Sequence, residues 1–268
     1  LTPYLSSSAQ NLISFFDIFS EMGIIENILN EFESYKFQGE KINEKPIELS
    51  TYNTYFFQTT LNEKNKPKLS NLNLKIEFGK LVNFVGEAGC GKRAVFYLLN
   101  KTCKPTSGSV FIDNKNISDI PPERFNKIVS CTTKEPFFYG VSIFENLMLV
   151  CPNKTKIQTA LKSFGLTEQI NKLPNKLNSL ISESNNSALK FFLGLARCYL
   201  SDAKILCIYE LPNFTNKHDL FVFKKILSFL KKECTVLLFS HSDEFSMLAD
   251  NTYYFENGDI KNKTETQS

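Results

Sequence analysis

The run Gly86-Glu-Ala-Gly-Cys-Gly-Lys-Arg93 constrains the fold more than any other segment of the chain. It has the spacing GxxxxGK of a phosphate-binding loop, and it lies between an apolar stretch at 81–85 and a segment of helical spacing at 94–100. Glycines let backbone N–H groups converge on phosphate oxygens, the start of the helix adds partial positive charge, and Lys92 can reach the terminal phosphates. The order strand, loop, helix therefore predicts an α/β core that binds phosphate. The alternative is a glycine turn that binds nothing.

Short apolar runs on both sides of this loop predict further strands. Residues 203–208 and 235–240 are mainly apolar, as in parallel strands buried on both faces. Less regular strand candidates lie at 47–49, 72–76, 110–112 and 128–131. Between 142 and 190 the pattern is mostly helical and polar, with Pro152 and Pro174 as breaks, which predicts a distinct helical lobe.

The composition indicates a globular protein with a hydrophobic core, and it does not indicate a particular binding partner. The chain has 268 residues, 42% of them hydrophobic, which is enough for a real core. A net charge of +3 with 22% charged residues is too balanced to indicate nucleic acid as the partner. The seven cysteines are scattered without a CxxC pair, so they indicate buried thiols, and no zinc or other metal site is predicted. No run of about 18 apolar residues is present that could cross a bilayer as a helix.

The first 45 residues differ in pattern from the rest, so we divide the chain into residues 1–45 and 46–268. From Ser8 to about Leu29 apolar residues recur at steps of three and four, which predicts an amphipathic helix, and a polar linker follows it. This helix is either an ordinary docked helix or a connection to membrane helices. Because the first residue is Leu1 and not methionine, we expect the chain to be a fragment of a longer protein.

A series of motifs resembles the ATP-binding cassette (ABC) family, in order and at the right intervals from about residue 47 to residue 260. Residues 83–92 resemble the Walker A segment of these cassettes. The further likenesses are the Pro-Thr-Ser-Gly turn at 104–113, the Q-loop region at 133–146, the signature helix and Walker B at 195–210, the H-loop at 240–241 and the terminal strand turn at 253–258. The resemblance implies a P-loop NTPase fold of the ABC-cassette type, with an antiparallel β subdomain at its start and a helical subdomain inserted at about 143–189.

The resemblance also implies roles for individual residues. Glu210 stands at the place of the catalytic base, which orients the attacking water, and His241 stands at the place of the switch that holds the γ-phosphate. The nucleotide-binding positions are Gly86, Glu87, Ala88, Gly89, Cys90, Gly91, Lys92, Arg93 and Ala94 in the P-loop, Lys134 in the Q-loop, and Phe56, or Tyr55 beside it, as the ring that stacks on adenine. The alternatives are that Glu210 is a strand-end carboxylate, that His241 is a satisfied polar group and that Phe56 belongs to the core.

The departures from the family pattern concern the metal. A Ser or Thr, a Gln and an Asp hold Mg²⁺ in a working cassette, and here those places are occupied by Arg93, Lys134 and Tyr209. The segment expected to read LSGGQ is Asn185-Asn-Ser-Ala-Leu189, without the glycines that bring its backbone close to a partner's γ-phosphate. These changes make Mg²⁺ doubtful as a cofactor and predict weak hydrolysis or none. Our hypothesis is that Arg93 and Lys134 themselves neutralise the phosphates, against the alternative that the site is empty.

The leading interpretation is the cassette of an exporter-type half-transporter that couples binding of ATP, and hydrolysis by this or a partner cassette, to transmembrane transport. The resemblance implies two partners, a transmembrane domain in the same or another chain and a second cassette in a homo- or heterodimer. It implies a membrane-associated position on the cytosolic or matrix face, with a mitochondrion-type organelle left open. The alternative is a soluble, catalytically inactive cassette-like protein that acts as an interaction or regulatory module. An active ATPase of another P-loop class is disfavoured, because the metal-binding Ser or Thr and Asp are missing.

Overall fold

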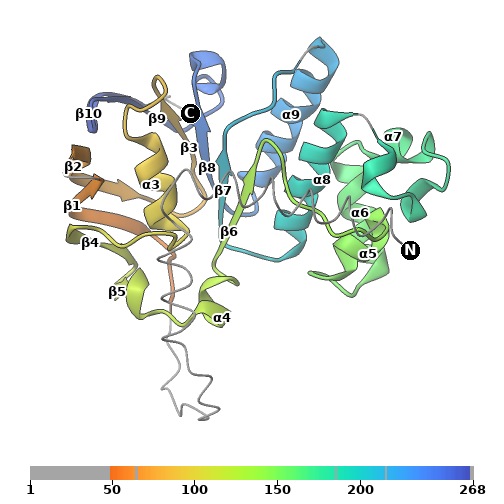
Figure 1. Cartoon of the computed structure of the whole chain (residues 1–268), viewed down its shortest axis with the longest axis horizontal. Coiled ribbons are helices and arrows are strands. Elements are labelled where there is room, and N and C mark those ends of the chain that lie inside the picture. The colour runs from red at the N-terminus through yellow and green to blue at the C-terminus, as the bar shows by residue number, and fades with distance from the viewer. Residues whose placement is uncertain (1–48, 64–65, 185, 215, 266–268) are drawn as a thin grey trace, which may run out of the picture. The chain divides into compact units, whose positions relative to one another are not determined.

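Continuous apolar strands form the centre of a six-stranded sheet in the order β10-β9-β3-β8-β7-β6. The computed structural model describes residues 49–63, 66–184, 186–214 and 216–265 (Figure 1). All five residues of β3 are buried, as a strand covered on both faces requires. The strands are β3 (Leu81–Val85), β6 (Val129–Thr133), β7 (Ile205–Tyr209), β8 (Thr235–Ser240) and β9 (Asn251–Glu256), which run parallel, and β10 (Asp259–Glu265), which is antiparallel to β9.

A second, antiparallel sheet is built from the segments before and after the P-loop helix. Its order is β2-β1-β4-β5, formed by β1 (Thr54–Glu63), β2 (Lys66–Ile76), β4 (Ser107–Ile112) and β5 (Lys115–Asn116). The combination of an antiparallel sheet and a mainly parallel sheet confirms the predicted α/β cassette fold. We predicted a strand at 47–49, of which the structure describes only Leu49. The prediction is wrong for this residue, because Leu49 has no strand conformation and the first described strand begins at Thr54.

The helices lie on both sides of the six-stranded sheet, with α3 on one side and α8 and α9 on the other (Figure 1). Successive side chains of a strand point to opposite faces, and the core follows this rule. In β7, Ile205 and Cys207 pack with α3 and the antiparallel sheet, whereas Leu206 and Ile208 pack with α8 and α9. The helices are α3 (Lys92–Leu99), α4 (Pro122–Phe125), α5 (Ile143–Met148), α6 (Lys154–Ser163), α7 (Thr167–Asn171), α8 (Ser187–Leu200) and α9 (Lys217–Leu230).

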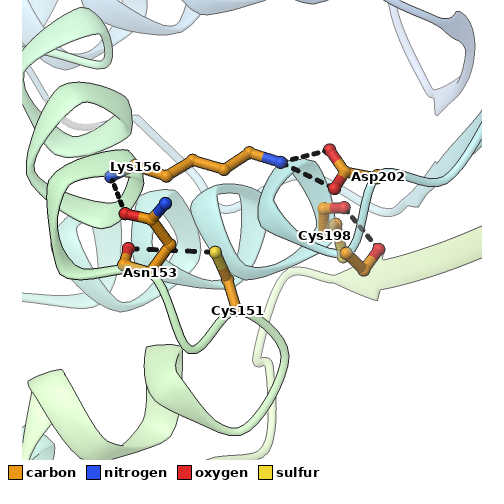
Figure 2. Close-up of polar contacts among 6 residues, drawn as sticks. Cys151, Asn153, Lys156, Cys198 and Asp202 are labelled. Atoms are coloured by element: carbon orange, nitrogen blue, oxygen red, sulfur yellow. Dashed lines mark hydrogen bonds and ion pairs between the residues drawn. The ribbon is translucent and has the colours of Figure 1, made fainter.

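Polar contacts fix the ends of the helices between β6 and β7. Ser142 and Glu145 form a reciprocal capping box at the start of α5. Asn153 caps α6, and Lys156 reaches across from α6 to the carboxylate of Asp202 just beyond α8, with N–O distances of 2.5 and 2.6 Å (Figure 2). The helical subdomain expected at about 143–189 falls on α5, α6, α7 and the start of α8. Its standing as a separate domain stays a prediction.

Two expectations concern the membrane and the first 45 residues. Over the ranges that the structure describes, we find no helix with both the length and the apolar character needed to cross a bilayer. The amphipathic helix and linker expected at 1–45 lie outside the described residues, which begin at residue 49 and form one compact unit.

Aromatic rings pack between β3 and both of its neighbouring strands. The ring of Phe84 is fully buried, and its centroid lies 4.9 Å from that of Phe239 in β8 and 5.8 and 5.7 Å from those of Tyr253 and Phe255 in β9. Such ring pairs add about 0.5–1.5 kcal/mol each beyond the apolar area that they bury. The strand that carries the P-loop is therefore held by side-chain packing on both of its edges.

We expect Phe84→Ala to lower the free energy of unfolding by about 3–5 kcal/mol, because three surrounding rings cannot refill the cavity. Urea denaturation followed by circular dichroism measures the loss. The matched control is Phe57→Ala, since the Phe57 side chain is 57% exposed on β1 and its removal should cost less than about 0.5 kcal/mol. Equal denaturation midpoints for the two variants would contradict this account of the core.

Candidate functional site

The P-loop leaves the carboxyl end of β3 and leads into α3, and its shape depends on glycine. Gly89 and Gly91 have φ values of 83° and 112°, in the left-handed region. A Cβ atom on Gly91 would lie 2.8 Å from the carbonyl oxygen of Lys68 and 3.0 Å from the Cα atom of Gly258. The Gly258 N–H also donates to the carbonyl of Cys90 at 2.9 Å. The base of the loop is thus clamped against β2 and the turn between β9 and β10.

Lys92 and His241 meet at the carbonyl of Gly86. The Lys92 side chain is 5% exposed, and its ammonium donates to the carbonyl oxygens of Gly86 and, at 3.0 Å, Glu87. The Nδ1 atom of His241 lies 3.2 Å from the same Gly86 oxygen. No side chain caps the N-terminus of α3, so its first-turn amides are not satisfied by a capping group. The amides and the lysine are the parts that a phosphate-binding loop needs.

The tip of the P-loop, residues 87–89, is exposed and forms one wall of a groove. The groove has a volume of about 580 Å³, within the range of small-molecule sites. Its opposite wall consists of residues 254–257 and Lys261. Sequence reasoning missed Lys261, since no motif in the chain distinguishes a lysine after the terminal strand turn from other surface lysines.

A charge cluster lies beside the loop, at the carboxyl ends of β6 and β7. Arg93 Nε donates to the hydroxyl of Tyr209 at 2.9 Å, and Arg93 Nη2 lies 3.8 Å from Glu210 Oε1. From the other side, Lys134 Nζ lies 3.5 Å from Glu210 Oε2. One carboxylate therefore stands between two cations that belong to different segments.

The protonation states in this cluster follow from its contacts. The hydrogen bond that Arg93 donates to Tyr209 is the main cause that raises the pKa of the Arg93 guanidinium. Burial raises the pKa of Tyr209, and a hydrogen bond to Glu210 raises it as well, although Arg93 acts in the opposite direction. At neutral pH Arg93 is a cation and Tyr209 is a neutral phenol.

These residues do not fit the Mg²⁺ ion that accompanies nucleotide in P-loop proteins. Mg²⁺ takes carboxylate, hydroxyl and water oxygens in an octahedral arrangement. The side chains that converge here are a guanidinium, an ammonium and a neutral phenol, and the carboxylate of Glu210 already faces both cations. A divalent ion would have to enter against the charge of Arg93 and Lys134.

Phe56 does not take the role expected of it. Its side chain is 3% exposed, and it lies between Leu74 of β2 and Val110 of β4 in the register of the antiparallel sheet. The expectation that Phe56 stacks on adenine is therefore wrong, and the core alternative holds. Tyr55, on the opposite face of the strand, is half-buried.

The segment at the place of the family's LSGGQ signature, residues 185–189, contains the residue that caps α8. The Asn186 side chain accepts a hydrogen bond from the amide of Leu189 at 3.0 Å and caps the helix. This is a structural use of the polar residue, of the kind common at helix N-termini. The expected roles of Glu210, His241 and the P-loop residues toward a nucleotide remain predictions, although the fold brings all of them to one edge of the sheet.

Comparison with known proteins agrees with this geometry. The model of the family described as ABC transporter matches residues 69–211, more than half of the chain. The chain is 26% identical to the ABC multidrug transporter atrD of Emericella nidulans, over 94% of this chain and 20% of that protein. It is 28% identical to the ABC transporter ATM1 of Plasmodium falciparum, over 71% of this chain and 19% of that protein. It is 27% identical to the putative ABC transporter ATP-binding protein MG015 of Mycoplasma genitalium, over 70% of this chain and 33% of that protein.

The chain thus spans between about a fifth and a third of the length of these relatives. The matched region begins in β2 and ends just after β7, so it contains the P-loop, the charge cluster and the helices between them. The chain belongs to the ABC transporter family, as an ATP-binding cassette homologous to those of exporter-type transporters.

Proposed function

We propose that this cassette uses the binding of ATP, with little hydrolysis of its own, to drive closure against a second cassette and to move an attached transmembrane domain. The observation that carries the proposal is the pairing of an intact P-loop with a carboxylate held by two cations. The loop amides and Lys92 support binding of the triphosphate. Arg93, Lys134 and Tyr209 oppose hydrolysis, because they stand where a working cassette has its Mg²⁺ ligands and none of them can bind the metal at neutral pH.

A partner cassette would supply the working half of the site. The loss of signature glycines at 185–189 weakens the half-site that this chain offers to a partner's nucleotide, while its own P-loop remains. A heterodimer with an active cassette fits this asymmetry better than a homodimer does. Closure on ATP binding and reopening after hydrolysis by the partner would then give the two states that transport needs.

An exposed apolar patch supports docking of a transmembrane domain. It surrounds α5, with Leu149 62% exposed at one end and the rings of Phe137 and Tyr139 in edge contact, 5.4 Å apart, at the other. The buried side chain of Asn146 holds this segment in place, since its amide accepts from the N–H of Tyr139 and donates to the carbonyls of Tyr139 and Val141. A rigid apolar patch on the surface of a domain is typical of an interaction site.

The other parts of the proposal rest on the sequence pattern. Residues 143–189 would form the helical subdomain that carries this patch, and residues 1–45 would connect the cassette to membrane helices. The protein would then be associated with a membrane on its cytosolic or matrix face. We assign the P-loop positions, Lys134, Glu210 and His241 to the nucleotide, as the family resemblance implies.

We expect Lys92→Ala to weaken ATP binding by about 10–100-fold, the worth of one or two charge-assisted hydrogen bonds. Titration of a fluorescent ATP analogue, in parallel with and without Mg²⁺, measures the affinity. Lys172→Ala is the matched control, because Lys172 is exposed after α7 and away from the loop. Absence of binding to the unchanged protein in both conditions would refute the proposed function.

We also expect ATP turnover by the isolated cassette to stay far below the rate of about 1 s⁻¹ at the low end for typical enzymes. The reason is that Arg93, Lys134 and Tyr209, at the places expected for the metal ligands, do not bind Mg²⁺. Phosphate release measured with Mg²⁺ tests this, with an active ATPase as the positive control. Turnover at ordinary enzymatic rates would contradict the proposed weak hydrolysis.

A third prediction concerns the apolar patch. The double variant Phe137→Ser, Tyr139→Ser should retain its affinity for ATP but lose co-purification with the transmembrane domain, because it removes two exposed rings from the docking surface. Phe221→Ser is the control, since Phe221 is equally exposed on α9 but outside the patch. If both variants co-purify as well as the unchanged protein, the patch is not the docking surface.

A further inference from the structure

We propose that this site binds the nucleotide as the metal-free triphosphate, with Arg93 and Lys134 in the electrostatic role of the metal ion and Glu210 as an internal anion that the phosphates displace. The inference rests on the proposed binding of ATP and specifies its chemical form. It concerns the side chains beside the P-loop, all of which the structure describes.

The first step is the charge of the cluster. Arg93 and Lys134 each lie near one carboxylate oxygen of Glu210, and Lys92 adds a further cation within the loop. The cluster of Arg93, Lys134 and Glu210 therefore carries a net positive charge. Metal-free ATP carries more negative charge than its magnesium complex, so this edge attracts the free form more strongly. A metal ion attached to the phosphates would meet the two cations at close range.

The second step is the strength of the contacts that must be broken. The ion pairs of Glu210 are 3.8 and 3.5 Å long, and the side chains of Arg93 and Lys134 are about half-exposed. Ion pairs of this length and exposure are weak, because solvent screens the charges. A phosphate group accepts hydrogen bonds from a guanidinium in pairs and is a stronger partner than a distant carboxylate. Exchange of Glu210 for phosphate oxygens is therefore favourable.

The third step is the orientation of the Arg93 guanidinium. Its Nε atom donates to Tyr209, which fixes the plane of the guanidinium and leaves the terminal nitrogens facing Glu210. Arg93 is the second residue of α3, directly after Lys92, so its guanidinium starts from the same uncapped helix terminus as the loop amides. The terminal nitrogens are thus preset for an anion at the position that the carboxylate now occupies.

The backbone of Glu210 supports this interpretation. Its φ is 57°, a left-handed conformation that is uncommon for a residue other than glycine. Such a conformation is strained for a residue with a side chain, and strained residues are concentrated at functional sites. In this structure it accompanies the placement of the carboxylate between Arg93 and Lys134.

The test is calorimetric titration of the 268-residue chain with ATP, once in EDTA and once in excess Mg²⁺. We expect binding in EDTA that is at least as tight as binding with Mg²⁺. In EDTA, Arg93→Ala and Lys134→Ala should each weaken binding by about tenfold or more, since each removes a charge-assisted contact to phosphate. Glu210→Gln should tighten binding in EDTA, because the amide no longer competes with the phosphates.

Binding that appears only with Mg²⁺ would overturn this inference and leave the proposed function intact, whereas no binding in either condition would overturn both. Tighter binding of Arg93→Ala would also overturn it, as it would show that the guanidinium blocks the site. The side chains of Arg93 and Lys134 are exposed, and circular dichroism of each variant confirms that it is folded. A double variant, Arg93→Ser with Lys134→Gln, should shift the preference toward Mg²⁺, and an unchanged preference would contradict the assigned roles.

Discussion

The parallel register of β3, β6, β7 and β8 is the constraint on which the site depends. Val85 pairs with Ser240, and Tyr209 pairs with both Thr133 and Phe239, so these strands end at one level. The segments that follow them carry the P-loop, Lys134, Glu210 and His241, which are far apart in the sequence. Ligands bind at the carboxyl ends of strands in sheets of this kind. The site is therefore a product of strand pairing and of the aromatic packing that keeps β3 between its neighbours.

The electrostatics of that edge differ from those of a metal-dependent site. In a P-loop protein that uses Mg²⁺, oxygen ligands and a divalent ion balance the phosphates. Here the protein supplies the positive charge through side chains, and it balances that charge internally with one carboxylate. The hydroxyl of Tyr209 links the two parts, because it accepts from Arg93 while its own proton is retained by burial and by Glu210. Arg93, Lys134 and Tyr209 replace three metal ligands that are far apart in the family's sequence pattern. In the fold they form one cluster around Glu210.

The sequence predicted the buried elements well and the half-polar ones poorly. β3 and β8 have the bounds expected for them, because residues covered on both faces leave a continuous apolar signal. β1 was missed because register shifts after Phe56 and a left-handed Gln58 interrupt its alternation of apolar and polar residues. The role expected of Phe56 came from the family resemblance, and its register in β1 supports the core alternative given beside it. The bond between Arg93 and Tyr209 could not be predicted, since it spans 116 residues and exists only through the strand register.

Lys134 connects the site to the apolar patch over a short stretch of chain. A Cβ atom on Gly194 of α8 would lie 2.7 Å from the ring of Pro136, and Arg197 lies over the ring of Phe138, 4.8 Å from its centroid. Pro136 and Phe138, which follow Lys134 within four residues, are therefore packed on α8. A ligand shifts a conformational equilibrium only through a difference in its contacts between two states. A change of Lys134 from the Glu210 carboxylate to a phosphate is such a difference, and close packing transmits displacement where a loose loop would absorb it.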